Sequence, residues 1–132
     1  MFKIIIGVFL ILHGLVHLLY FGQARRLFEM RPGMLWPDGS WFFSRFMGQG
    51  AARILAGTAC TVATAVFVVA GVVMLSGQVW WRPLVEDAAL LSTAIFFLFW
   101  DGKLHKLADQ GYFAILINLA MLVAVIVFHL SV

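Results

Sequence analysis

Charged residues are scarce in this chain of 132 residues: Asp, Glu, Lys and Arg together make up 11% of it. A soluble domain is about a quarter charged and about half apolar, whereas 64% of this sequence is hydrophobic. A small soluble fold leaves much of its surface in water, so it cannot bury so large an apolar share. The composition therefore excludes an ordinary soluble domain and predicts a single transmembrane domain over residues 1–132.

Cysteine and acidic residues are also few. Cys60 is the only cysteine, which excludes an internal disulfide, and its position in an apolar run favours a buried packing residue over a reactive thiol. Six acidic residues stand against nine Lys and Arg, giving a formal charge of +3. These basic residues flank apolar runs, as membrane-orientation signals do, so we expect no nucleic-acid partner.

Sequence motifs of phosphate loops, nucleophile elbows and zinc proteases are absent as well.

Long apolar runs are what the sequence does contain. A helix needs about 20 mostly apolar residues at 1.5 Å each to cross a bilayer. We predict an all-α integral membrane four-helix bundle with spans at approximately 4–21, 52–76, 84–106 and 111–130. Its immediate partner is then the lipid bilayer, and we expect it in the cell (inner) membrane.

The third span is unusually short. Asp87 and Asp101 leave 13 residues between them, which cover roughly 20 Å as a helix, against a hydrocarbon core of about 30 Å. Pro83 suits the first turn of a helix, and Glu86 suits the positive end of the helix dipole. We therefore predict a helix from near Pro83 through His105, with a carboxylate at membrane depth or a locally thinned bilayer.

Lysine and arginine are distributed unevenly, which predicts the orientation of the chain. The first and third loops with their flanks hold seven of them: Arg25, Arg26, Arg31, Arg45, Arg53, Lys103 and Lys106. The opposite side has only Lys3 and Arg82. This asymmetry predicts that both of these loops lie in the cytoplasm and that both chain termini lie outside it.

The loop over residues 22–50 is too aromatic for a plain linker. It interleaves tryptophan and phenylalanine with arginine, and it has turn signals at 31–33 and 36–40. A basic, aromatic-rich segment beside a span most simply lies in the membrane interface. The alternative is that it folds back over the mouth of a pocket.

Small residues recur every three or four positions in the second span: Ala52, Ala56, Ala59, Cys60, Ala63 and Thr64. Small side chains let helices approach closely in lipid, where no hydrophobic effect drives them together. We interpret the pattern as packing within the bundle. Self-association into a homo-oligomer, or assembly into a larger membrane complex, is the alternative.

Polar residues within the spans are the candidates for a functional site, because ionisable groups are costly in lipid. His13 and His17 share one helix face, and Asp101 and His105 have the same spacing. The predicted topology puts His17 about one turn, and His13 about two, from the cytoplasmic end of their helix. Asn118 lies roughly 10 Å into the fourth span from that side.

We therefore predict a ligand site in the cytoplasmic half of the bundle, formed by His13, His17, Asp101 and His105 with Asn118 in support. Thr58 and Thr61 fall at a similar depth. His129 lies at the opposite end and is left out. Each residue taken singly is more typical of a hydrogen bond between helices. The convergence of polar groups from all four helices is what favours a site.

These residue types fit several ligands. His13 and His17 at i and i+4 could hold one metal ion, with a carboxylate and another histidine completing the set. Haem needs axial histidines facing a cavity, which helical bundles provide. A quinone or other lipid-like ligand needs an apolar slot with a His or Asp at its polar end. Proton relay by an Asp–His pair is a further alternative.

The four-span layout resembles that of small DoxX-like membrane proteins, some of which are linked to quinone-coupled oxidation. The resemblance rests on the layout alone and carries no site residue. We thus predict a small tetraspan protein that binds a hydrophobic or redox ligand, whether quinone, haem, lipid or metal. The alternatives are a non-catalytic membrane subunit or oligomeric scaffold, and a small oligomeric transporter or channel. Whether the chain is an enzyme stays open.

Overall fold

The computed structural model describes residues 1–127, and over that range the chain is helical, with no strand. Its four α-helices are α1 (Phe2–Ala24), α2 (Ser44–Leu75), α3 (Trp81–Leu98) and α4 (Tyr112–Leu122). A 3₁₀ helix, η1 (Leu107–Gln110), precedes α4, and a π-helical turn, η2 (Val123–Val127), follows it. The predicted all-α class is confirmed. His129 and the end of the predicted fourth span lie outside the described residues.

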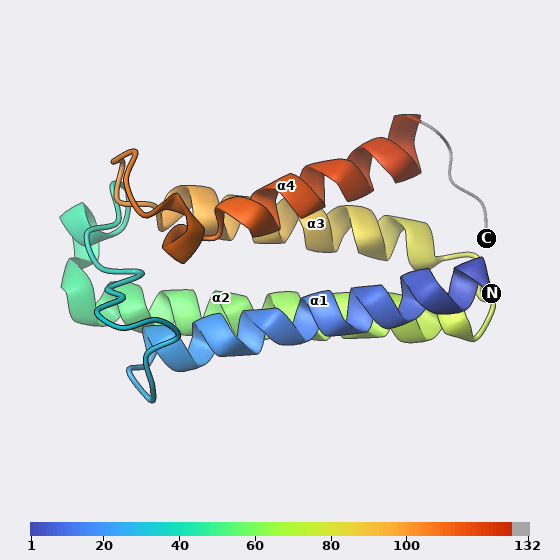
Figure 1. Cartoon of the computed structure of the whole chain (residues 1–132), viewed down its shortest axis with the longest axis horizontal. Helices are drawn as coiled ribbons and strands as arrows, with labels where there is room; N and C mark the ends of the chain where they lie inside the picture. Colours follow the sequence, from blue (N-terminus) through green and yellow to red (C-terminus); the bar gives the residue numbers. More distant parts are fainter. Residues whose placement is uncertain (128–132) are drawn as a thin grey trace.

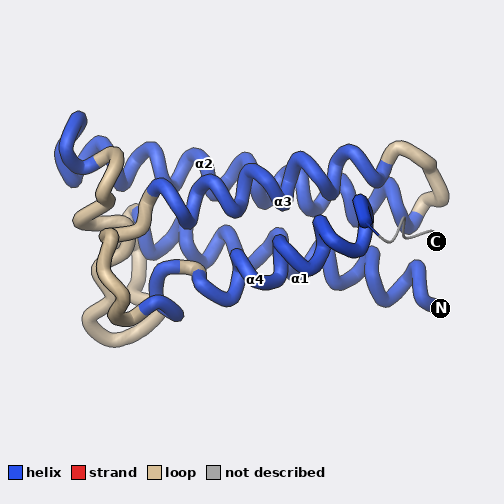
Figure 2. Tube along the Cα trace, turned by 90° about the horizontal axis from the view of Figure 1, so that it is seen from above, coloured by secondary structure: helices blue, strands red, loops and turns tan. Residues whose placement is uncertain are grey.

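The four helices run along one long axis (Figure 1). α1 packs mainly on α2, α2 also packs on α3, and α3 packs on α4. The start of α1 and the end of α4 lie at one end of the bundle, which we call the terminal end. The first loop (25–43) and the third loop (99–111) lie together at the other, which we call the loop end (Figure 2).

The helix starts follow local sequence. Pro83 lies in the first turn of α3, where its missing N–H costs nothing, as the sequence predicts. Gly48 has a φ of 77° inside α2, so the turn before it is set at an angle to the long helix that follows. A left-handed conformation of this kind is one that glycine adopts without strain.

The end of α3 differs from the prediction. The helix ends at Leu98 rather than continuing through His105, because the first loop takes the last carbonyl groups. The hydroxyl of Ser40 donates to the Leu98 carbonyl at 2.6 Å. The Trp41 indole N–H donates to the carbonyl of Phe97 at 2.8 Å. Such bonds to orphan carbonyls stop a helix. Residues 101–105 therefore lie in the third loop.

Small residues bring α1 and α2 into close contact. A Cβ added at Gly71 would lie 2.7 Å from the carbonyl oxygen of Gly7 and 2.6 Å from a side-chain carbon of Ile11. Of the six small residues predicted to pack within the bundle, Ala59 is partly buried. The other five are buried: Ala52, Ala56, Cys60, Ala63 and Thr64. The stripe of α2 thus packs inside the chain, and Cys60 is a buried packing residue as predicted.

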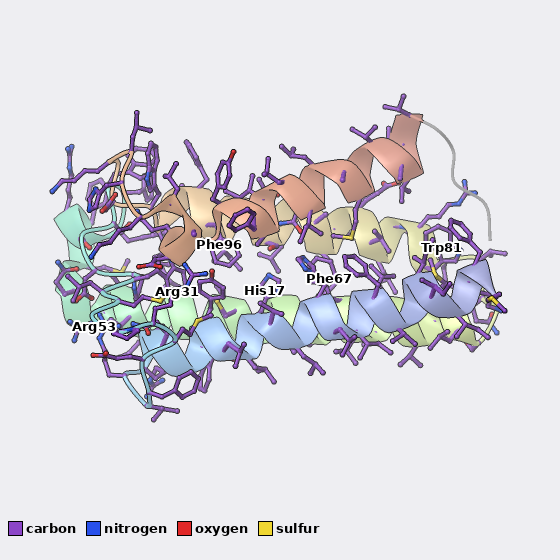
Figure 3. The ribbon with its side chains drawn as sticks, viewed as in Figure 1. His17, Arg31, Arg53, Phe67, Trp81 and Phe96 are labelled. Atoms are coloured by element: carbon purple, nitrogen blue, oxygen red, sulfur yellow. The ribbon has the colours of Figure 1, made fainter. Side chains whose placement is uncertain are left out.

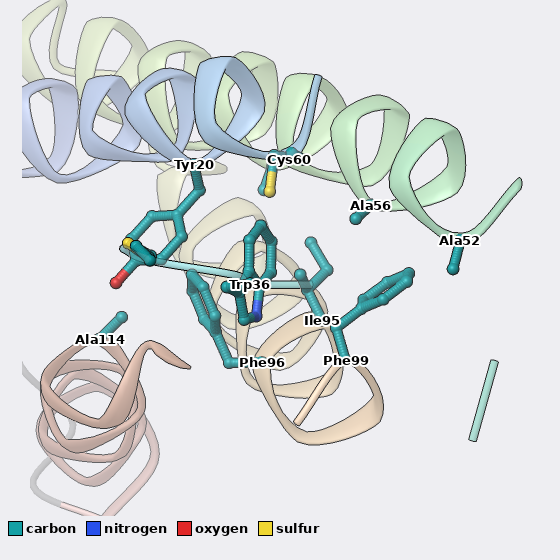
Figure 4. Packing of buried hydrophobic residues seen from close by; sticks show 12 residues of the cluster. Tyr20, Trp36, Ala52, Ala56, Cys60, Ile95, Phe96, Phe99 and Ala114 are labelled. Atoms are coloured by element: carbon teal, nitrogen blue, oxygen red, sulfur yellow. The ribbon is translucent and has the colours of Figure 1, made fainter. Parts of the chain in front are cut away.

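The middle of the first loop packs onto the loop end of the bundle. The Trp36 side chain is only 3% exposed. It packs against Tyr20 at 5.0 Å and Phe96 at 5.7 Å between ring centroids (Figure 4). The fully buried amide of Gln23 donates to the carbonyl of Met34 and accepts from the backbone N–H of Met30.

Ion pairs fasten this loop to the helices. Asp38 pairs with Arg26 at 2.9 Å and with Arg53 at 2.6 Å, and Arg31 pairs with Asp109 of the third loop. Burial raises the pKa of the Asp38 carboxyl, but hydrogen bonds and positive charge from Arg53 and Arg26 outweigh it. The net pKa of Asp38 therefore lies below its ordinary value.

Two of the helices, α1 and α2, are long and apolar enough to cross a membrane. Residues Tyr112–Val127 form a shorter apolar helix. Large apolar side chains remain exposed along the outer faces, as on Ile5, Leu12 and Leu19 of α1. Contiguous exposed apolar surface on this scale is typical of a membrane or interaction surface.

Candidate functional site

A chain of buried polar side chains crosses the middle of the bundle. One of them, His17, is labelled between the helices in Figure 3. His13 lies at the midpoint of α1, and His17 lies one turn nearer the loop end. Both are about one turn deeper than the sequence predicts, because α1 continues to Ala24 instead of ending near Phe21. The histidines thus occupy the centre of the helix rather than its end.

His17 uses both of its ring nitrogens within the protein. Its Nδ1 lies 3.0 Å from the carbonyl oxygen of His13, and its Nε2 lies 2.7 Å from the hydroxyl of Ser92 on α3. A carbonyl can only accept a hydrogen bond, so Nδ1 carries the proton of the neutral ring. The Ser92 hydroxyl therefore donates to Nε2.

His13 extends the chain of hydrogen bonds to α4. Its Nε2 lies 3.1 Å from Oδ1 of Asn118, so the imidazole donates to the amide oxygen. From α2, the Thr64 hydroxyl donates to the carbonyl of Gly14 at 2.9 Å. Ser92, His17, His13 and Asn118, which we call the central polar chain, thus join α3, α1 and α4.

The amide of Asn118 leaves one polar atom unpaired. Its side chain is fully buried, and its Nδ2 has no hydrogen-bond partner among the described residues. Turning the amide over would leave the oxygen unpaired instead. Leaving a buried polar group unpaired costs about 1–3 kcal/mol. The central polar chain therefore ends on α4 in an unused donor.

Aromatic rings surround the two histidines. His13 stacks on Phe9 at 5.8 Å and meets the edge of Phe67 at 4.9 Å between ring centroids. His17 lies 5.4 Å from Phe67 and 5.7 Å from Phe96. These rings fill the space on either side of the central polar chain.

An apolar cleft of about 330 Å³ opens beside the polar chain in the terminal half of the bundle. It is present because α4 inclines away from α1 toward the terminal end (Figure 1). Phe9 and Leu10 line it one helical turn from His13, and Ile117 and Met121 line it on either side of Asn118. Further lining residues are Trp81, Val85 and Ala124.

Asp101 and His105 do not join the histidines of α1. They lie in the third loop, with His105 Nε2 3.9 Å from Asp101 Oδ2. Asp101 also accepts hydrogen bonds from the backbone of Lys103 and from the amide of Gln110. The single predicted site therefore divides into two places. His13, His17 and Asn118 meet mid-bundle, while Asp101 and His105 lie at the loop end because α3 stops before them.

Sequence reasoning missed Ser92, and at this depth it pointed to Thr58 and Thr61 rather than to Thr64. Thr58 and Thr61 are exposed and donate to carbonyls of their own helix, whereas Thr64 is buried and also donates to the carbonyl of Gly14 on α1. A hydroxyl inside an apolar helix is satisfied by its own backbone, so its presence in the sequence carries little information. The available signal was that Thr64 lies four residues after Cys60 and three before Phe67, on the same helix face as the small residues.

Metal ligation gains no geometric support. Among residues 1–127, no group of three or more His, Cys, Asp or Glu side chains lies close enough to hold an ion. An iron or zinc atom on His17 would first have to displace Ser92 or the His13 carbonyl. The haem and metal hypotheses thus stay as predictions from sequence.

Comparison of the chain with protein-family models, curated proteins and solved structures gives no match. The geometry of the chain itself is therefore the basis for assigning a function.

Proposed function

We propose that the chain is an integral membrane protein in which all four helices cross the bilayer. The sequence has no charged residue over 4–24, 54–75, 88–98 or 111–127, and large apolar side chains face outward there. α3 has 18 residues, about 27 Å as a helix, which nearly matches a hydrocarbon core of about 30 Å. Its charged residues, Arg82, Glu86 and Asp87, all lie near the terminal end.

Aromatic side chains at both ends of the bundle support the same proposal, that the helices cross the bilayer. Trp80 is half exposed at the terminal end, and Trp41 and Tyr112 are exposed at the loop end. Tryptophan and tyrosine favour the headgroup level of a bilayer. The outward side chains of Phe42 in the first loop and of Phe46 at the start of α2 would lie in that interface. The basic loop end faces the cytoplasm in this proposal, and both termini lie outside it.

The ligand that we propose is lipid-like, with its apolar part in the cleft between α1 and α4. The observation that carries this proposal is the unpaired Nδ2 of Asn118, which does not itself line the cleft but lies next to the lining residues Ile117 and Met121 on α4. A ligand oxygen that accepted from this nitrogen would remove the cost of leaving it unpaired. A quinone carbonyl, an ester or a hydroxyl could each supply that oxygen.

A scaffold or non-catalytic subunit is the second candidate. The observation in its favour is that both ring nitrogens of His17 are already satisfied inside the protein. In this case the central polar chain only holds three helices together, and the cleft is filled by bulk lipid chains without selection.

The two candidates differ in whether the cleft retains one molecule. We would extract the protein gently and record its native mass spectrum, looking for a bound small molecule. Ala124→Phe fills the cleft, and Ala94→Phe, at an exposed site on α3 outside it, is the matched control. We expect wild type and Ala94→Phe to retain one defined adduct and Ala124→Phe to lose it. An adduct unchanged by Ala124→Phe, or no defined adduct, favours the scaffold.

A further inference from the structure

The loop end holds a second cavity, separate from the cleft between α1 and α4. It is a polar cleft of about 430 Å³ between the first and third loops. Three carboxylates line it, and each already has a partner: Asp38 pairs with Arg26 of the first loop and Arg53 of α2, Asp109 pairs with Arg31, and Asp101 accepts from Gln110. Arginine therefore neutralises Asp38 and Asp109, whereas the Asp101 carboxylate, bonded to an uncharged amide, keeps its charge.

The basic side of the polar cleft is not neutralised. Lys103 and Lys106 both line it, and within residues 1–127 neither ammonium group makes an ion pair or a hydrogen bond. Both lysines are well exposed on the third loop. These two cations outnumber Asp101, the one carboxylate of the cleft that no arginine pairs with, and the surplus positive charge favours an anionic ligand.

An apolar groove of about 240 Å³ adjoins this polar cleft on the flank of α3 and α4. Gln110 lines both cavities. Leu104, 84% exposed, lines the groove, while its neighbours Lys103 and His105 line the polar cleft. Phe97, 52% exposed, continues the groove along α3. The third loop thus presents cations to one side and apolar atoms to the other.

From this arrangement we infer that the loop end binds an anionic phospholipid. Its phosphate lies in the polar cleft against Lys103 and Lys106, and one acyl chain lies in the groove against Leu104 and Phe97. Charge complementarity selects the anion, and the adjoining apolar groove selects a headgroup that carries a hydrocarbon chain over a soluble phosphate. Anionic headgroups are bound by basic pockets beside membrane helices in this way. The inference rests on the proposed membrane crossing and is independent of the cleft ligand.

Thermal unfolding in a neutral detergent tests the inference. We would add dimyristoyl phosphatidylglycerol, dimyristoyl phosphatidylcholine or glycerol 3-phosphate to the purified protein and record the unfolding midpoint. We expect phosphatidylglycerol to raise the midpoint in a saturable manner and the other two to leave it unchanged. An equal rise with phosphatidylcholine would overturn the inference, and so would an equal rise with glycerol 3-phosphate, which would indicate a small-anion site.

Substitutions locate the site. The double variant Lys103→Gln/Lys106→Gln should bind phosphatidylglycerol about 30-fold more weakly, because each lysine near an anionic lipid contributes about a fivefold gain. Lys3→Gln, which removes one positive charge at the terminal end, should bind as wild type does. Circular dichroism shows whether the double variant is folded, and Leu104→Asn, which keeps both lysines, gives an independent test by weakening lipid binding. Unchanged affinity in both loop variants contradicts the inference.

The Ala124→Phe variant separates this inference from the proposed function. It should lose the cleft adduct and still respond to phosphatidylglycerol as wild type does. No response to phosphatidylglycerol in a wild-type protein that retains its cleft adduct would overturn the lipid site alone. A wild-type protein that retains no cleft adduct but still responds to phosphatidylglycerol would overturn the cleft ligand alone.

Discussion

A neutral histidine inside an apolar bundle needs one donor and one acceptor, and His17 finds both. It donates to a carbonyl of its own helix and accepts from Ser92 on the neighbouring helix. Removing the serine hydroxyl leaves Nε2 buried without a donor, which costs more than the loss of an exposed hydrogen bond. Ser92 is thus expected to contribute stability even though it is a small residue.

The first prediction compares two neighbouring residues of α3. Ser92→Ala should lower the free energy of unfolding in detergent by about 1–3 kcal/mol, because it leaves the His17 nitrogen unpaired. Thr93→Val should change it by no more than about 0.5 kcal/mol, since the Thr93 hydroxyl only donates to the Ala89 carbonyl of its own helix. Equal losses in the two variants would show that His17 gains nothing from Ser92.

At this scale the sequence predicted part of the site. His13, His17 and Asn118 could be identified because a polar side chain within an uncharged run of 20 residues is conspicuous. Asp101 and His105 were placed with them because the predicted third helix continued to His105. The hydrogen bonds from Ser40 and Trp41 that end the helix come from a loop distant in sequence, and no local pattern reveals them.

Among the elements, the contact of α1 with α2 depends on glycine. A side chain at Gly71 would meet the backbone oxygen of Gly7, which cannot move unless one helix shifts. The helices themselves were predictable, since apolar runs and the proline at 83 mark them. The small residues of the second span indicated that some helix packs closely on it, but not that this helix is α1.

The second prediction uses two glycines of α2. Gly71→Ala should lower the free energy of unfolding by about 1–3 kcal/mol, because the added methyl group forces α1 and α2 apart. A Cβ added at Gly50 would meet no atom within 4 Å. Gly50→Ala should therefore leave the free energy of unfolding unchanged or raise it by up to about 1 kcal/mol, because alanine has the higher helix propensity. Denaturation of both variants in the same detergent checks the difference. A stable Gly71→Ala protein would contradict the packing described for α1 and α2.

The third prediction concerns the first loop, which Asp38 holds by its two arginine partners. The pKa of Asp38 is lower in the folded chain than in the unfolded one, so its ion pairs stabilise the fold above about pH 4. This stabilisation disappears as the pH falls through the folded-state value. Unfolding midpoints of wild type and Asp38→Asn should differ at pH 7 and converge below about pH 4.

A charge-matched control accompanies that measurement. Asp87→Asn removes one carboxylate at the terminal end, away from the first loop. Proteolysis of the first loop offers a second readout, and it should be faster in Asp38→Asn at pH 7. Midpoints of wild type and Asp38→Asn that stay parallel down to pH 3 would contradict the assigned role of Asp38.

For the whole molecule, the proposed topology places the first and third loops on one side, and the second loop and the termini on the other. The fourth prediction is that reporter enzymes active only outside the cytoplasm are active when fused after Gln78 or after Val132. Fluorescent protein fused after Gly33 or Leu104 should be fluorescent in the cytoplasm. The basis is the excess of Lys and Arg at the loop end. Reporters that all indicate the same side would contradict four crossings.

The central claim is that a bilayer-spanning bundle leaves a cleft between α1 and α4 that one lipid-like molecule fills. A crystal structure grown from a lipidic mesophase, with protein purified without delipidation, tests it most directly. We predict elongated density along Phe9, Ile117 and Ala124, with one polar end about 3 Å from Nδ2 of Asn118. A cleft closed by direct packing of α4 on α1, with the Asn118 amide paired to protein, would contradict the claim.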